Sequence, residues 1–202
     1  MSKLRLVHGV GIYEKGRYSA SENDKPTKVY NAWQAMLGRC YDSKYHEKKP
    51  TYIGCSVCEE WHHFQNFATW YDANYPNGDG SYQLDKDLKV SGSKIYSPET
   101  CLFVSSVVNT FTTDSGSIRG EYMIGVCWHK RGQKYLACCS NPFTKKVEYL
   151  GLFTNELEAH HAWRKRKSEL AYELAMAQEN DEVKNAILNW KKNLDENKIH
   201  VI

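Results

Sequence analysis

Three short segments in the second half of the chain alternate hydrophobic with polar residues, the pattern of strands that are buried on one face. These segments cover residues 122–128, 134–140 and 147–153. Residues 154–178 then show apolar positions at helical spacing, and Asn155 with Glu158 forms a candidate capping box at the start of that helix. The pattern predicts a three-stranded antiparallel sheet packed on one long helix. Residues 181–194 predict a last amphipathic helix that packs on its own chain or forms a partner interface.

The first half of the chain predicts helices around short strands. Apolar residues recur at helical spacing over residues 28–41, and an aromatic stripe predicts a second helix over residues 55–76. The remaining predicted elements are strands over residues 1–13, 82–90 and 101–104 and a short helix over 105–111. The predicted fold class is α+β: a two-strand-and-helix finger with flanking helices, followed by the three-stranded antiparallel sheet on its long helix.

Charge is distributed unevenly along the chain and supports a division into two domains. Residues 1–118 carry 13 basic and 13 acidic side chains, whereas residues 119–167 carry 10 basic and 4 acidic ones, a net charge of +6. The polar stretch TTDSGSIRG coincides with this boundary, so we predict domains at residues 1–114 and 115–202. A concentrated basic segment is the electrostatic footprint of a polyanion site, and a solvated positive face is the alternative.

The chain shows no sign of a membrane segment. Its longest apolar runs fall short of the roughly 20 residues that span a bilayer, and the N-terminal residues lack the apolar core of a signal peptide. We therefore expect no membrane partner and a location in the cytoplasm. The seven cysteines are an odd number, which fits free thiols in a reducing compartment.

One pair of cysteines has the spacing of a metal site. Cys55 and Cys58 are separated by two residues, as in zinc knuckles. A structural zinc site needs two more ligands, which Cys40 and Cys101, or His62 in place of one of them, could supply. The alternative interpretation is that these cysteines are buried thiols without a metal.

Side chains suited to DNA contact gather in the basic segment. Lysine and arginine neutralise phosphates, arginine also reads guanine, and tryptophan and tyrosine can pack against sugars and base methyl groups. The candidate DNA-binding residues are Arg119, Trp128, Lys130, Arg131, Lys134, Tyr135, Lys145 and Lys146. For Trp128 the alternative is a plain sheet-packing residue. The basic run at 164–167 could touch phosphate, lie on a solvated helix face, or pair with the nearby Glu169 and Glu173.

Residues 119–163, RGEYMIGVCWHKRGQKYLACCSNPFTKKVEYLGLFTNELEAHHAW, resemble the DNA-binding domain named after the plant apetala and ethylene-response factors. The shared pattern is GVCW, then KYLA, then LGLFTNELEA. That family reads duplex DNA through arginines and tryptophans on a three-stranded sheet. By position, the resemblance implies DNA contacts here from Trp128, Lys130, Arg131, Lys134 and Tyr135.

Residues 84–104, LDKDLKVSGSKIYSPETCLFV, resemble an HNH nuclease finger. They are also similar to phage and bacterial proteins in which such a finger precedes an apetala-type domain, and which are described as homing-type endonucleases. In the finger a carboxylate holds Mg²⁺ and a histidine activates the attacking water. The resemblance implies that Asp85 is the metal-binding aspartate, with Asp87 and Asn109 as possible further oxygen ligands.

Three positions depart from the finger's usual pattern, and one of them is Thr100, which stands where many fingers have an asparagine on the metal side. Lys86 stands where the histidine would be, and Ser93 stands where the lineage usually has asparagine. A lysine is protonated at neutral pH and is therefore a poor base, although it could clamp a phosphate. A neighbouring histidine, His62 or His63, could replace the base. The candidate catalytic set of an active enzyme is therefore Asp85, Lys86 and His63.

The sequence leads to two functional hypotheses. The preferred one is a sequence-specific double-stranded DNA-binding protein of homing-endonuclease lineage, from a phage or mobile element, which acts as a nuclease-inactive transcription regulator or repressor in the bacterial cytoplasm. The alternative is an Mg²⁺-dependent HNH endonuclease that cuts or nicks DNA at a specific site. The first needs no cofactor, the second needs magnesium, and either could carry structural zinc or form a homodimer.

Overall fold

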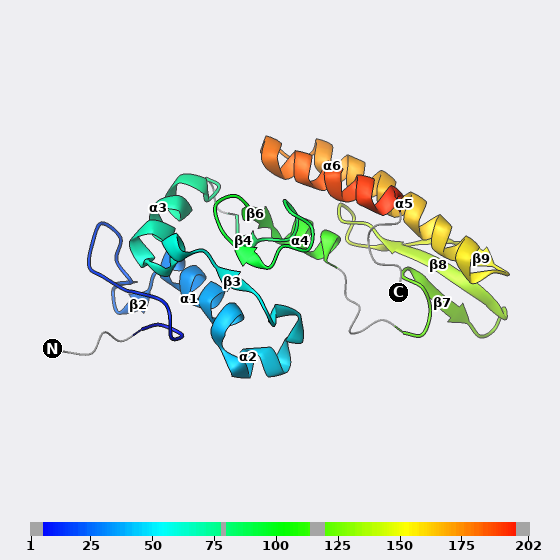
Figure 1. Ribbon diagram of the computed structural model, residues 1–202. Coiled ribbons are helices and arrows are strands. Elements are labelled where there is room, and N and C mark those ends of the chain that lie inside the picture. The colour runs from blue at the N-terminus through cyan, green and yellow to red at the C-terminus, as the bar shows by residue number, and fades with distance from the viewer. Residues whose placement is uncertain (1–5, 78–79, 114–119, 197–202) are drawn as a thin grey trace. The chain divides into compact units, whose positions relative to one another are not determined.

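The computed structural model describes residues 6–77, 80–113 and 120–196 (Figure 1). The chain divides into two compact units, residues 1–105 and 106–202. The domain border predicted at 114/115 itself lies outside the described residues. The helix that precedes it, α4 (Ser106–Thr112), belongs to the second unit, because Phe111 of this helix contacts Trp190 near the C-terminus with ring centroids 5.7 Å apart.

Helices form most of the first unit, and its strands are short. The helices are α1 (Lys28–Tyr41), α2 (Ser43–Lys48) and α3 (Phe64–Asn74), with single 3-10 turns η1 (Pro50–Tyr52) and η2 (Glu59–His62). The strands are β1 (Ser21–Glu22), β2 (Lys25–Pro26), β3 (Ser56–Val57), β4 (Tyr82–Asp85), β5 (Ile95–Tyr96) and β6 (Leu102–Ser105). They pair two by two: β1 with β2 and β4 with β6 are antiparallel, whereas β3 with β5 is parallel.

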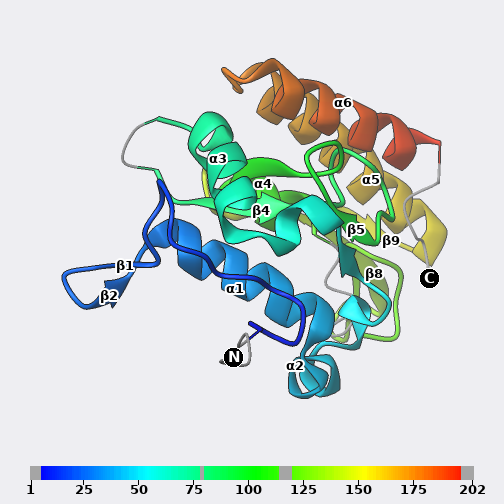
Figure 2. The ribbon, with the colours of Figure 1, turned by 60° about the vertical axis from the view of Figure 1, so that its left-hand side comes forward.

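An aromatic core joins α1 to α3, whose ribbons lie beside each other in Figure 2. Trp33 on α1 and Phe64 on α3 are fully buried, and their ring centroids are 5.5 Å apart. Trp33 also donates a hydrogen bond of 2.7 Å from Nε1 to the carbonyl oxygen of Trp61, so the polar atom of this buried ring has a partner. The helical spacing of residues 28–41 therefore predicted α1 correctly, because one continuous stripe of that helix faces the core.

Three elements of the first half differ from the prediction. The predicted strand at 1–13 forms only isolated bridges within its described part, because His8 and Gly9 adopt positive φ and turn the chain. The predicted helix over 55–76 begins only at Phe64, since the residues before it form β3 and η2. The predicted strand at 82–90 ends at Asp85, whose side chain closes a turn.

The second unit is an antiparallel sheet backed by helices, as the alternation of its residues predicted. The sheet has the order β7 (Val126–His129), β8 (Lys134–Ser140) and β9 (Val147–Phe153). It is followed by α5 (Glu156–Met176) and α6 (Asp181–Asp195), and Figure 1 shows α5 running along the sheet with α6 beside it. The HNH-like finger predicted for the first half stays a prediction, although its two strands, β4 and β6, do pair.

Two local features fix α5 on the sheet. Asn155 caps the helix, because its Oδ1 accepts hydrogen bonds from the backbone N–H groups of Leu157 and Glu158 at 2.7 and 3.4 Å. Gly125, just before β7, has a φ of +79°, and a Cβ at this position would overlap the buried ring of Trp163. Only glycine therefore permits both this backbone conformation and the close approach of α5.

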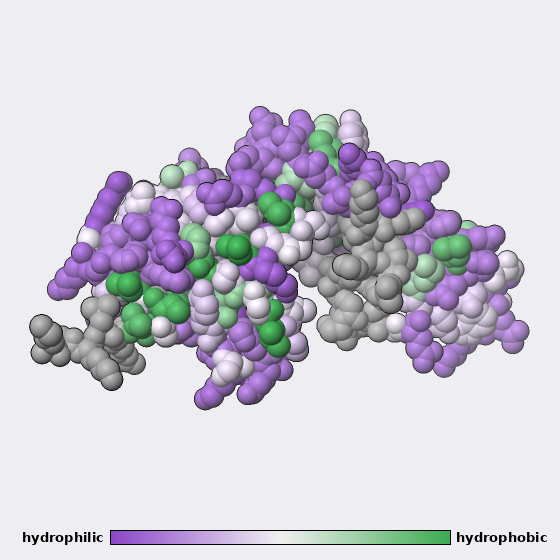
Figure 3. Space-filling model, in the orientation of Figure 1, coloured by the Kyte–Doolittle hydropathy of each residue, from purple (hydrophilic) through white to green (hydrophobic). Residues whose placement is uncertain are grey.

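The last helix packs on its own chain. Val183, Ala186, Ile187 and Leu194 of α6 are buried, and this helix contacts α5. Figure 3 shows that the outward surface of these two helices is mostly hydrophilic. Of the two alternatives that the sequence left open, the structure supports intramolecular packing rather than a partner interface. Across the described residues, we find no helix that combines the length and apolar character needed to cross a membrane.

Candidate nucleic-acid interface

The sheet of the second unit has one covered face and one open face. Ala137 and Cys139 on β8 are buried, and successive side chains of a strand point to opposite faces. Glu148 pairs with Cys139 in the strand register, and it forms an ion pair with Arg166 of α5 at 2.6 Å. The face that contains Ala137, Cys139 and Glu148 is therefore the face covered by α5, and the neighbouring positions belong to the open face.

The open face carries exposed apolar side chains together with a few polar ones. By alternation and register it contains Cys127, His129, Lys134, Leu136, Cys138, Ser140, Val147, Tyr149 and Leu152. The exposed fractions of Val147, Tyr149 and Leu152 are 68%, 66% and 36%. Large apolar side chains at such exposure, on adjacent positions of one sheet face, mark a surface that is suited to a partner.

Basic side chains lie at both ends of β8. Lys130 and Arg131 are in the hairpin loop that joins β7 to β8, and Lys134 begins β8 itself. Lys145 and Lys146 are in the loop that joins β8 to β9, at the other end of the strand. All five side chains are exposed, and among the described residues none of them has an acidic ion-pair partner. They are therefore available to an anionic ligand.

Trp128 and Tyr135 lie on the other side of the sheet. They are register partners, and their rings meet edge to face with centroids 5.0 Å apart. Tyr135 is two residues from the buried Ala137 on the same strand, so both side chains lie on the face that α5 covers. Trp128 lies on this face too, although it is still 39% exposed. This placement favours the sheet-packing alternative for Trp128. The remaining candidate, Arg119, lies outside the described residues.

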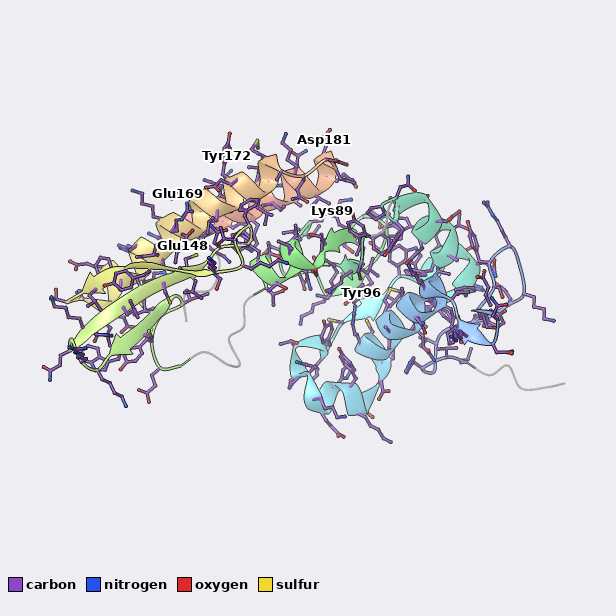
Figure 4. The ribbon with its side chains drawn as sticks, turned by 180° about the vertical axis from the view of Figure 1, so that it is seen from behind. Lys89, Tyr96, Glu148, Glu169, Tyr172 and Asp181 are labelled. Atoms are coloured by element: carbon purple, nitrogen blue, oxygen red, sulfur yellow. The ribbon has the colours of Figure 1, made fainter. Side chains whose placement is uncertain are left out.

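The basic run on α5 is used largely inside the protein. Arg166 donates to Glu148, Glu169 and Glu173 at 2.6, 3.1 and 3.4 Å, and Figure 4 shows Glu148 and Glu169 on the same side of the second unit. The hydrogen bonds from Arg166 and from Asn141 lower the pKa of Glu148 to about 2. The pairing with glutamates on α5 that the sequence suggested is confirmed for Arg166.

Lys167 is likewise occupied by its own unit. Its Nζ donates a hydrogen bond of 2.7 Å to the carbonyl oxygen of Phe111. The same Nζ lies 3.5 Å from the centroid of the Phe111 ring. Burial lowers the pKa of this lysine to about 8. Since the last two members of the run, Arg166 and Lys167, have internal partners, the loops carry more of the available positive charge than α5 does.

In the first unit, Asp85 closes a turn at the end of β4. Its Oδ1 accepts hydrogen bonds from the backbone N–H groups of Asp87 and Leu88 at 3.0 and 2.7 Å. Burial raises the pKa of Asp85 above its usual range, while the two backbone hydrogen bonds act in the opposite direction. One carboxylate oxygen of the predicted metal ligand therefore already has a structural role.

Lys86 points into the first unit rather than toward solvent. The residue is 6% exposed, and its Nζ donates to Asp87 Oδ1 at 2.6 Å and to the carbonyl oxygen of Ser93 at 2.8 Å. The ammonium group also lies 5.8 Å from the ring centroid of Tyr96, which is labelled in Figure 4. A lysine held in this way stabilises the 85–96 loop, and its ammonium group is not placed to reach a phosphate from solvent.

Ser93 and the two histidines considered as replacement bases also have local partners. Ser93 Oγ donates to the carbonyl oxygen of Ile95 at 3.1 Å, which orders the entry into β5. His63 Nδ1 lies 3.1 Å from Glu14 Oε1, and His62 Nε2 lies 3.4 Å from the hydroxyl oxygen of Tyr41. The structure therefore links both histidines to groups other than the aspartates at 85 and 87.

A magnesium site at the predicted ligands stays a prediction. Asp87 Oδ1 is bound to an ammonium group, which would oppose a cation at the same oxygen. Asn109 lies on α4. Within the described ranges, no group of three or more His, Cys, Asp or Glu side chains is arranged to hold a metal ion.

The four cysteines proposed for zinc belong to the core of the first unit. Cys40, Cys55 and Cys101 are buried there, and Cys58 packs against the same cluster. Burial raises the pKa values of Cys40 and Cys101 to about 12, so these side chains are neutral thiols in this structure. Burial in one cluster fits both alternatives that the sequence left open, so the zinc site stays a prediction.

The apolar residues of the open face belong to no motif that marks them in the sequence. The alternation within residues 147–153 indicates that the strand has two faces, but it does not say which face a helix covers. The strand register and the ion pair between Glu148 and Arg166 of α5 decide this. Comparison with known proteins adds no further assignment: no family model matches the chain, and no curated protein and no solved structure matches it either.

Proposed function

We propose that this protein binds double-stranded DNA through the open face of its three-stranded sheet and the two basic loops at its ends. The observation that carries the proposal is the set of five exposed basic side chains, at Lys130, Arg131, Lys134, Lys145 and Lys146, that no described acidic side chain neutralises. Lysine and arginine that remain unpaired in the free protein can contact phosphates without first breaking an internal ion pair.

The spacing of the loops supports a duplex as the ligand. β8 has seven residues, Lys134 to Ser140, and the two loops lie at its opposite ends. At about 3.3 Å per residue, the loops are roughly 20 Å apart. The major groove is about 12 Å wide and admits a β-sheet. The two loops could therefore contact phosphates on both sides of a groove that the open face enters.

We further propose that the protein binds DNA without cutting it, and so acts as a regulator or repressor. A repressor needs affinity and position only, and the second unit offers both. In the first unit, Lys86 is buried against Asp87 and Ser93, and Asp85 Oδ1 accepts two backbone N–H groups. These contacts support a structural role for the segment that resembles a nuclease finger, and DNA binding then requires no cofactor.

A gel-shift experiment tests the binding proposal. The double variant Lys145→Ala/Lys146→Ala should weaken binding to duplex DNA and lower the slope of log K against log salt by about two, since each phosphate contact contributes about 0.9. The matched control is Lys48→Ala/Lys49→Ala, which removes two adjacent exposed lysines from the first unit. Equal losses in both variants would show that the binding is general charge attraction and would contradict the proposed interface.

Strand cleavage is the second candidate function, and one observation favours it. The strands β4 and β6 pair antiparallel and α4 follows directly along the chain, which is the order of a nuclease finger, with Asp85 at the end of β4. The purified protein should leave supercoiled plasmid intact in Mg²⁺ or Mn²⁺. Nicking that disappears in Asp85→Asn, a substitution that keeps an oxygen acceptor for the turn, would establish a nuclease instead.

A further inference from the structure

We propose that the open face recognises thymine-containing DNA by contact with the C5 methyl groups in the major groove. The residues that we assign to this readout are Val147, Tyr149 and Leu152 on β9, with Leu136 beside them on β8. This inference rests on the proposed function, because it names the class of duplex that the same face would select.

The exposure of these side chains is the first step. Val147 and Tyr149 are the most exposed large apolar residues of the described chain, at 68% and 66%. Their neighbour Glu148 points to α5, so the two side chains project from the opposite face of β9. Leu152 and Leu136 are register partners on the same face. The apolar groups therefore form a continuous patch across two strands rather than isolated surface residues.

The chemistry of the major groove is the second step. Its donors and acceptors are polar, and the methyl group of thymine is the apolar feature that the bases present there. Arginine or lysine reads guanine, and asparagine or glutamine reads adenine, through pairs of hydrogen bonds. The strands β7, β8 and β9 contain no arginine, asparagine or glutamine, and their one lysine, Lys134, stands at the first position of β8. The other polar groups of the open face come from His129 and Ser140, so most of this face is apolar. The face is thus suited to methyl groups.

The charge around the patch identifies DNA, rather than another protein, as the occupant. Lys130 and Arg131 border the patch at one end, and Lys145 and Lys146 border it at the other. A second copy of the chain would bring the same basic loops against this face and would meet like charge. A duplex instead has a phosphate backbone on each side of its major groove and thymine methyl groups on the groove floor. The phosphates would meet the two basic loops, and the methyl groups would meet the apolar patch.

The experiment uses four alternating duplex polymers and the full-length chain. Poly(dA-dT) and poly(dA-dU) differ only in the thymine methyl group, and poly(dG-dm5dC) and poly(dG-dC) differ only in a methyl group at the equivalent position. Burial of one methyl group is worth about fourfold in an equilibrium constant, so contact with two should give about fifteenfold. We expect poly(dA-dT) to bind about fifteenfold more tightly than poly(dA-dU), and methylation of cytosine to strengthen binding in the same direction.

Two variants separate the methyl readout from phosphate contact. Val147→Ser/Tyr149→Ser should bring the ratio of affinities for poly(dA-dT) and poly(dA-dU) close to one while leaving the salt slope unchanged. Both positions are exposed, so the substitution should not disturb the fold, and thermal unfolding of the variant checks this. The control, Lys145→Ala, should weaken binding to all four polymers by the same factor and keep the ratio.

The outcomes are distinguishable. Equal binding to all four polymers with a steep salt dependence would overturn the methyl readout and leave the DNA-binding proposal standing. Binding to none of them would overturn both. Self-association of the protein that Val147→Ser/Tyr149→Ser abolishes, together with equal polymer affinities, would identify a second copy as the occupant of the face and would also overturn the inference.

Discussion

Lys86 of the first unit and the loop lysines of the second unit have opposite surroundings. Lys86 in the first unit is buried, and it donates to Asp87 and to the carbonyl oxygen of Ser93. Lys134, Lys145 and Lys146 in the second unit are exposed, and no described acidic side chain pairs with them. The same residue type thus serves the fold in one unit and remains available to a ligand in the other.

This difference shows how basic residues that can bind a phosphate are distinguished from those that stabilise the fold. A cation that already has hydrogen-bond partners must lose them before it can bind a phosphate, and that loss reduces the net gain. Arg166 shows the same principle within the second unit, because three glutamates pair with a residue that the sequence left open as a phosphate contact. Internal pairing, rather than residue type, therefore separates structural from functional charge.

The largest expected effect on stability comes from Lys86. The substitution Lys86→Met keeps most of the side-chain volume but leaves the carbonyl group of the half-buried Ser93 without its donor. A buried polar group that loses its partner costs about 1–3 kcal/mol, so the first unit should unfold at lower urea concentration. Urea unfolding followed by tryptophan fluorescence measures this, since Trp33 and Trp61 are buried in that unit.

Lys44→Met is the matched control, because Lys44 is exposed on α2. It should change the free energy of unfolding by less than about 0.5 kcal/mol. If the two variants had the same stability, Lys86 would not be a structural residue, and its role as a phosphate ligand would have to be reconsidered. DNA affinity should be unchanged in both variants.

An intermediate effect is expected from the ion pair between Glu148 and Arg166, and it depends on pH. The folded-state pKa of Glu148 is lowered to about 2, whereas a glutamate in an unfolded chain has a pKa of about 4.3. A lowered pKa stabilises the folded state above the unfolded value, and this contribution is lost as the pH falls through the folded value. The stability difference between the wild-type protein and Glu148→Gln should therefore be full above about pH 5 and vanish near pH 2.

The control for this experiment is Glu179→Gln, which changes an exposed glutamate between α5 and α6. Its stability relative to the wild-type protein should not vary over the same pH range. A difference for Glu148→Gln that stays constant from pH 5 to pH 2 would mean that the carboxylate does not depend on Arg166 as the geometry indicates.

The smallest effect on stability is expected from the exposed loops. Lys134→Ala should leave the free energy of unfolding within about 0.5 kcal/mol of the wild-type value. The same change should weaken binding to all duplex sequences and lower the salt slope by about one. Thermal unfolding and a salt titration of DNA binding on the same sample check both expectations. If Lys134→Ala were destabilised and its salt slope were unchanged, Lys134 would be a structural residue and not a phosphate contact.

The bounds of helices and strands were predicted correctly where the spacing of apolar residues within one element is regular. The helix over 28–41 and the strands over 134–140 and 147–153 have the predicted bounds, because each buries a single face with regular spacing. Prediction failed where polar side chains turn the chain. The predicted strand at 82–90 stops at Asp85, since this carboxylate binds two backbone N–H groups that a longer strand would give to its neighbour.

The sequence by itself determined the mixed α+β composition, the sheet followed by two helices, and the concentration of basic residues in the second half. Tertiary structure decided which of these residues face outward. Strand register and the Glu148–Arg166 ion pair separated Tyr149 from the face of Ala137 and Trp128. Alternation along a strand gives two faces but does not say which one a helix covers, and pairing of charges depends on neighbours that are distant in the chain. The fold therefore supplied the distinction on which the proposed function depends.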